Sequence, residues 1–173
     1  MHPDLNTLIR APYFDTYLKT LDSANTLECL RYSKQKFIDV ISNLSNDQLD
    51  YSYQSHKWSI KELIVHLIDT EIIFNYRALR IGRESVAQKL EGFDENAYAS
   101  QANLDNLNKA DLIAFFSSVR DSSMLLYKTF TSEQLNRIGE ASNHNVQAKA
   151  LFLINAGHTL HHLNIINERY LTR

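Results

Sequence analysis

The sequence contains few cysteine, proline and glycine residues, on which disulfide-rich and β-sheet proteins depend. Its 173 residues include one cysteine, two prolines and four glycines. A single cysteine excludes an internal disulfide and a cysteine-based zinc motif, and it suits a reducing compartment. Both prolines, Pro3 and Pro12, lie close to the start, so the rest of the chain has few of the breakers that punctuate β proteins. We therefore expect an all-α protein.

The charge of the chain is nearly balanced, so the sequence shows no sign of a strongly basic or strongly acidic binding surface. Eighteen Lys and Arg against twenty Asp and Glu give a net charge of -2, and no long block of like charges occurs, which argues against a nucleic-acid partner or an anionic membrane surface. Residues 1–6 do not form a basic segment followed by an apolar one, and no apolar run has the length of a membrane span. We expect no export or membrane signal and a cytoplasmic location.

Apolar residues recur at spacings of three and four, which predicts amphipathic helices. The length fits one domain covering residues 1–173. Four helices of roughly 20 residues each are expected, and such helices bury their apolar faces most simply as a four-helix bundle. The predicted helices cover about residues 24–44, 59–82, 108–130 and 145–170.

Two helix starts carry clear capping signals. Ser59 with Glu62 three residues later forms a capping box, which satisfies two backbone N–H groups of the first turn. Asn108 is a favoured N-cap residue, and Gly82 marks the end of the second helix.

The connection between the second and third predicted helices, residues 83–107, is longer than the usual bundle link of about 2 to 8 residues. It would be either a crossover that acts as a lid or a segment that only returns the chain along the length of the bundle. Phe93, Asp94 and Tyr98 in this connection would line a pocket, but an exposed loop explains them equally well.

Three histidines, His158, His161 and His162, lie in an otherwise apolar helix. His158 and His162 are four residues apart and share the centre of the apolar face, whereas His161 lies off it. We expect His161 to be a surface residue; the alternatives are that it supports a metal ligand or faces the substrate. A buried polar group without a partner costs roughly 1 to 3 kcal/mol. The pair therefore needs hydrogen bonds or a shared cation, and the best supplier of a third ligand is His66 in the second helix.

These motifs resemble those of the DinB-like, YfiT-related proteins, a superfamily of four-helix bundles regarded as metal-dependent enzymes. The resemblance runs from about Leu30 to Tyr170. It rests on three groups of residues: Lys57–Glu62 followed by His66; Asp69–Glu71 with Arg77 and Arg80; and Gly157–His162 with Glu168–Tyr170.

The resemblance implies that His66, His158 and His162 bind a divalent metal ion, nickel or zinc first among the candidates. Some members resemble thiol-S-transferases that use a low-molecular-weight thiol cofactor, and others are regarded as hydrolases. It therefore implies a metal-dependent transferase or hydrolase acting on a small molecule, and it allows a homodimer. The alternative is a non-catalytic metal-binding bundle with a structural or interaction role, in which a carboxylate such as Glu71 closes the coordination sphere.

The charged residues near these motifs have two interpretations each. Glu71 falls on the buried face of the second helix, where pairing with a buried arginine is favoured over orienting a metal ligand. Glu62 is explained by its cap, and Asp69 has no assigned role.

The arginines also have two interpretations each, and the remaining aromatic and histidine residues are expected to be structural or surface residues. Arg77, Arg80 and Arg120 would bind an anionic substrate or cofactor, but ion pairs explain arginines more often. Trp58 precedes the Ser59 cap and is expected to pack in the core. The histidines expected to be ordinary surface residues are His2, His56 and His144. No catalytic residue is assigned.

Overall fold

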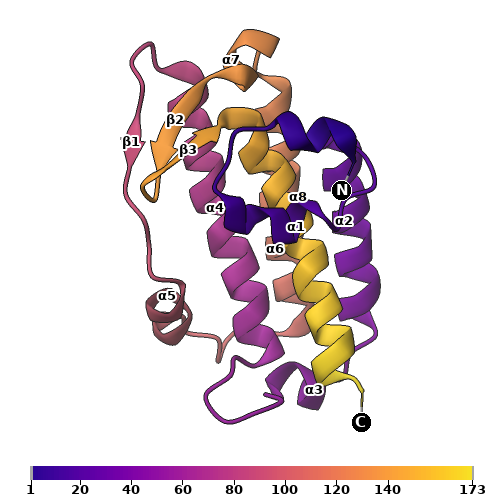
Figure 1. Ribbon diagram of the computed structural model, residues 1–173. Helices are drawn as coiled ribbons and strands as arrows, with labels where there is room; N and C mark the ends of the chain where they lie inside the picture. The colour runs from indigo at the N-terminus through magenta and orange to yellow at the C-terminus, as the bar shows by residue number, and fades with distance from the viewer. Residues whose placement is uncertain (1, 173) are drawn as a thin grey trace.

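Four long helices form the body of the computed structural model, which describes residues 2–172 (Figure 1). They are α2 (Thr26–Ser42), α4 (Ile60–Arg83), α6 (Lys109–Lys128) and α8 (Ala148–Ile165). A π-helical turn, Ile166–Tyr170, continues α8. The four-helix bundle expected from the sequence is confirmed.

Shorter elements lie at the two ends of the bundle and along more than one of its sides (Figure 1). Two 3-10 helices, Pro3–Thr7 and Pro12–Phe14, precede the short α1 (Asp15–Leu18). The other short helices are α3 (Asn46–Asp50), α5 (Glu95–Gln101) and α7 (Ser132–Asn136).

A small sheet was not expected from the sequence. Strand β2 (Ile138–Ala141) pairs in parallel with β1 (Lys89–Leu90) and antiparallel with β3 (His144–Gln147). The predicted start of the fourth helix at about residue 145 is therefore wrong, because the chain is extended in β3 until α8 begins at Ala148. Strands this short give no alternating pattern long enough to separate them from a helix.

The predicted helix starts are confirmed in atomic detail. Ser59 Oγ accepts the Glu62 backbone N–H at 3.2 Å, and the Glu62 carboxylate accepts the Ser59 N–H at 2.6 Å. Asn108 forms the same reciprocal pair with Asp111. Helix α4 ends at Arg83, one residue beyond the predicted stop at Gly82.

Helices α4 and α6 run in the same direction. Glu71, Asn75 and Arg83 along α4 bond to Arg120, Ser123 and Thr129 in the same order along the chain. The connection between the two helices must therefore return along the length of the bundle, as Figure 1 shows for β1 and α5. The spanning role of this connection is confirmed, and α5 packs against α4 on the way.

The core consists of two apolar clusters with a polar layer between them. In α4, the first cluster ends at Ile68 and the second begins at Phe74. In α8 the order is reversed: the second cluster ends at Ala156 and the first begins at Leu163. Between the clusters, five buried polar residues bond to one another, and we call them the polar layer; they are Ser33, Glu71, Arg120, Ser123 and Thr159.

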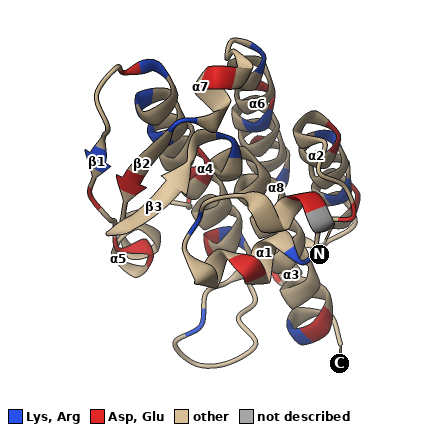
Figure 2. Ribbon diagram, turned by 45° about the horizontal axis from the view of Figure 1, so that its top comes forward, with Lys and Arg blue, Asp and Glu red and all other residues tan. Residues whose placement is uncertain are grey.

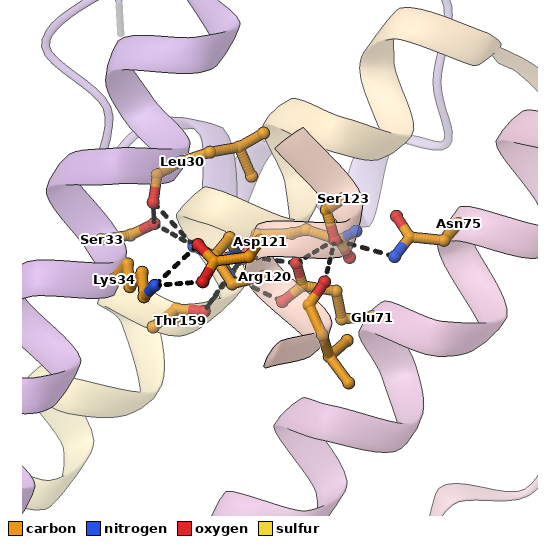
Figure 3. Close-up of polar contacts among 11 residues, drawn as sticks. Leu30, Ser33, Lys34, Glu71, Asn75, Arg120, Asp121, Ser123 and Thr159 are labelled. Atoms are coloured by element: carbon orange, nitrogen blue, oxygen red, sulfur yellow. Dashed lines mark hydrogen bonds and ion pairs between the residues drawn. The ribbon is translucent and has the colours of Figure 1, made fainter. Parts of the chain in front are cut away.

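Arg120 is the centre of the polar layer and is completely buried. Its Nε and Nη2 donate to the two carboxylate oxygens of Glu71 at 2.7 and 2.8 Å (Figure 3). The same guanidinium donates to Ser33 Oγ on α2 and to Thr159 Oγ1 on α8. One side chain of α6 thus bonds to the other three long helices, and the structural interpretation of Glu71 and Arg120 is confirmed.

The outer surface carries charges of both signs. Figure 2 shows acidic and basic residues interspersed along the helices, in keeping with the net charge of -2. Within residues 2–172, no helix combines the length and the hydropathy that crossing a membrane requires.

Removing one partner of the buried ion pair is expected to destabilise the protein strongly. Glu71→Leu and Arg120→Met should each lower the free energy of unfolding by about 3–5 kcal/mol, because each leaves a buried charge unpaired. The double variant should lose clearly less than the sum, as measured by urea denaturation. Asp121→Ala, which breaks an exposed pair with Lys34, should cost less than about 1 kcal/mol. Additive single effects at Glu71 and Arg120 would contradict this account.

Candidate metal centre

Helices α4 and α8 bring the three predicted histidines together. His66 Nε2 lies 3.1 Å from His158 Nε2, which lies 2.9 Å from His162 Nε2. All three nitrogens lie within 4.8 Å of one another. Metal–nitrogen bonds of about 2.0–2.1 Å at tetrahedral angles put ligand nitrogens about 3.3 Å apart, so the spacing suits a single ion.

Hydrogen bonds alone do not satisfy this cluster. A neutral imidazole nitrogen has either one N–H or one lone pair, so it makes one good hydrogen bond in the ring plane. His158 Nε2 has two close imidazole neighbours, and one of these contacts is left without good hydrogen-bond geometry. His162 Nδ1 is buried and has no hydrogen-bond partner among the described residues. A cation between the three Nε2 atoms would accept all three lone pairs at once.

Burial keeps the imidazoles neutral. Desolvation lowers the pKa of His66 to about 4 and that of His162 to about 3. The pKa of the buried His158 is also lowered well below its usual value, first by desolvation and then by the neighbouring imidazoles. Neutral imidazole is the form that binds metal, so the site is ready to bind at neutral pH.

Two aromatic side chains cover the cluster. The ring of Tyr17 lies 4.8 Å from that of His158, and the ring of Trp58 lies 4.7 Å from that of His66. Gly157 lets the Tyr17 segment approach α8, because a Cβ at this position would lie 2.4 Å from the Tyr17 carbonyl oxygen. The glycine beside the histidines therefore has a packing role.

The three histidines lie in the wall of an open pocket of about 500 Å³. Residues from α4, from α8, from the segment before α2 and from the long connection meet there. Besides the histidines, the pocket is lined by Tyr13, Phe14, Tyr17, Trp58, Thr70, Phe74, Arg77, Gly92, Phe93, Glu95 and Ser142.

Known proteins that resemble this chain identify its family. The model of the DinB superfamily matches residues 30–166. The chain belongs to the DinB superfamily. A relative from Oceanobacillus iheyensis, named "Putative metal-dependent hydrolase OB0413", is 24% identical over 131 residues, 72% of each chain.

A solved structure has the same fold. YfiT from Bacillus subtilis, described as "a probable metal-dependent hydrolase with an unusual four-helix bundle topology", superposes with a TM-score of 0.72 at 18% identity. The superposition covers 83% of this chain and 82% of that one. It supports the bundle architecture of this DinB superfamily member.

Other predicted residues of this DinB protein divide between the pocket and its surroundings. Arg77 and Phe93 line the pocket, and so does Trp58, which is half-buried beside His66 rather than packed in the core. Glu71 does not close the cluster, because both its carboxylate oxygens accept from Arg120. His161 is half-buried against Tyr17.

The remaining candidates have local roles. Arg80 pairs with Glu84 outside the pocket, and Asp94 caps α5. Tyr98 is exposed and contacts Phe93. Asp69 is half-buried and lies outside the histidine cluster.

Several pocket residues were not assigned to the site from the sequence. Thr70 and Phe74 follow His66 at successive spacings of four residues, so this face of α4, which also carries the predicted Arg77, was visible as a helical stripe. Tyr17 and Glu95 gave no such signal, because they reach the site from short elements whose position depends on tertiary packing.

A methyl group at Gly157 is expected to push the Tyr17 segment away from α8. Gly157→Ala should therefore lower the free energy of unfolding by about 1–3 kcal/mol in denaturant titrations. The matched control is Gly92→Ala, where the nearest atom to the new methyl group is Ser142 Oγ at 3.5 Å, an ordinary contact. Equal effects of the two substitutions would refute the packing role of Gly157.

Proposed function

We propose that this protein is a metal-dependent enzyme, a hydrolase in the first place, in which His66, His158 and His162 hold one divalent ion, zinc or nickel. The observation that carries the proposal is the meeting of three neutral imidazole Nε2 atoms in the wall of an open pocket. The names of the Oceanobacillus and Bacillus proteins support the same reaction class.

A divalent ion held by His66, His158 and His162 would favour deprotonation of a water or thiol bound to it. Residues around the metal site have different roles. Trp58 and Tyr17 shield the histidines from bulk water, which strengthens electrostatic interactions inside the pocket. The polar layer holds α4 and α8 in the register that keeps the ligands together.

Glu95 is the proposed proton acceptor. Among the described residues that line the pocket, it is the one carboxylate. Its charge acts on His66 from the wall formed by α5, where it raises the pKa of the imidazole against the larger lowering by burial. A carboxylate in this place can take up a proton released by the nucleophile.

The metal content tests the foundation of this proposal. Protein purified without a histidine tag should contain about one zinc or nickel ion per chain, as measured by inductively coupled plasma mass spectrometry. His158→Ala should lose most of it, because two imidazoles bind far more weakly than three. His161→Ala is the matched control and should keep the metal. Negligible metal in both the wild type and His158→Ala would defeat the proposal.

Measuring kcat for a Glu95 variant tests the role of this carboxylate. In a panel of activated esters and amides, Glu95→Gln should lower kcat about 100-fold with unchanged metal content, because the amide cannot accept the proton. Glu91→Gln changes an exposed carboxylate of the same connection that does not line the pocket. It should leave kcat unaltered. A Glu95→Gln enzyme with full kcat would remove Glu95 from the reaction.

A second candidate function is transfer of a low-molecular-weight thiol to an electrophile. The observation that favours it is a second pocket, of about 240 Å³, which shares Trp58 and His162 with the first. Lys57 and Arg169 line this second pocket and give it a basic character. Two pockets meeting at one histidine would accommodate a cofactor and a substrate at the same time.

A direct comparison separates the two reactions. The metal-loaded protein is incubated with small thiols and electrophiles, and in parallel with esters and amides alone. Hydrolysis without any thiol supports the first candidate, whereas turnover that requires the thiol supports the second. Activity in neither set would favour a non-catalytic metal-binding bundle.

A further inference from the structure

Arg77 is a buried cation in the wall of the pocket. It lies on the same helix as His66, about three turns further along, and is 4% exposed. Its Nη2 donates to the Glu91 carbonyl oxygen at 2.7 Å and to Ser142 Oγ at 3.1 Å. These bonds fasten Arg77 to the long connection and to the turn between β2 and β3.

No carboxylate neutralises Arg77 within residues 2–172. Its Nε and Nη1, which carry three N–H groups, have no hydrogen-bond partner there, and Glu95 forms no ion pair with it although both line the pocket. By contrast, Arg80 pairs with Glu84 and Arg120 with Glu71. The Nε and Nη1 atoms of Arg77 are not among the buried polar atoms that lack a partner, so they keep some exposure, and an anion that enters the pocket can accept their hydrogen bonds in place of water.

Aromatic rings define the rest of the pocket around Arg77. The guanidinium carbon lies 5.4 Å from the ring centre of Phe74 and 5.7 Å from that of Phe93. Rings stacked on a guanidinium cover its faces and leave the N–H groups at its edge for an anion. Phe14 and Tyr17 continue the apolar wall towards the histidines.

We propose that Arg77 binds the carboxylate of a small substrate whose apolar body lies on these rings and whose reactive group faces the three histidines. The reaction at the histidines rests on the proposed function, but anion binding at Arg77 does not. A pocket of about 500 Å³ accommodates a ligand of this size. The competing interpretation is that Arg77 only fastens the connection and the β2–β3 turn.

Calorimetric titration with acid and amide pairs separates the two interpretations. The probes are benzoate, phenylacetate and 3-phenylpropionate, each with its neutral primary amide, which has nearly the same shape. Metal-loaded and chelator-treated protein are both titrated, because a carboxylate also binds metal. For the best-fitting pair, the wild type should bind the acid on the order of tenfold more tightly than the amide in both states.

Substitutions at Arg77 should remove this preference. Arg77→Met should bind acid and amide equally, while Arg77→Lys, which keeps the charge, should retain part of the preference. Arg80→Met removes a charge from the same helix outside the pocket and should bind like the wild type. Circular dichroism checks that each variant is folded. If Arg77→Met is not folded, Arg77→Lys decides the test, because an undiminished preference in that variant alone would contradict the proposal.

Three results would overturn the proposal. The first is a wild type without preference for any acid, including one that binds none of the probes. The second is a preference that survives both substitutions at Arg77. The third is a preference that disappears on chelation, which would assign the carboxylate to the metal. Because the chelator-treated protein is titrated separately, loss of the metal-dependent function alone would leave the Arg77 result intact.

Discussion

A buried arginine fixes the level at which the four long helices meet. Arg120 lies between two apolar clusters and bonds to Glu71, Ser33 and Thr159 on the other three helices. Sliding one helix by a turn, about 5.4 Å, would leave this guanidinium or its carboxylate partner buried without a bond, at a cost of several kcal/mol. Apolar packing alone tolerates such shifts much better, so the polar layer provides the register.

The candidate metal centre depends on that register. Thr159 follows His158 directly, and Glu71 lies just over one turn beyond His66 on α4. The arrangement that satisfies Arg120 therefore also brings the His66 and His158 nitrogens to 3.1 Å. The ion pair is turned into the core and leaves the histidines to the pocket, so the two polar groups at this level have separate roles: one orders the bundle and the other is open to ligands.

Features that depend on residue spacing within one helix could be predicted from the sequence. The capping box at Ser59, the shared helix face of His158 and His162, and the buried pairing of Glu71 all follow from spacings along one helix. The sheet and half of the pocket wall do not, because Tyr17 and Glu95 reach the site from short elements placed by tertiary contacts. The resemblance to a known family supplied support for His66 that spacing within one helix cannot give.

The most direct test of the central claim is X-ray absorption spectroscopy of the zinc-loaded protein. Three imidazole nitrogens are expected at about 2.0–2.1 Å from the metal, with the remaining coordination supplied by exchangeable oxygen ligands that change when a small thiol is added. A first shell with fewer than three imidazoles, or one closed by protein ligands and insensitive to added thiol, would contradict an open centre formed by His66, His158 and His162.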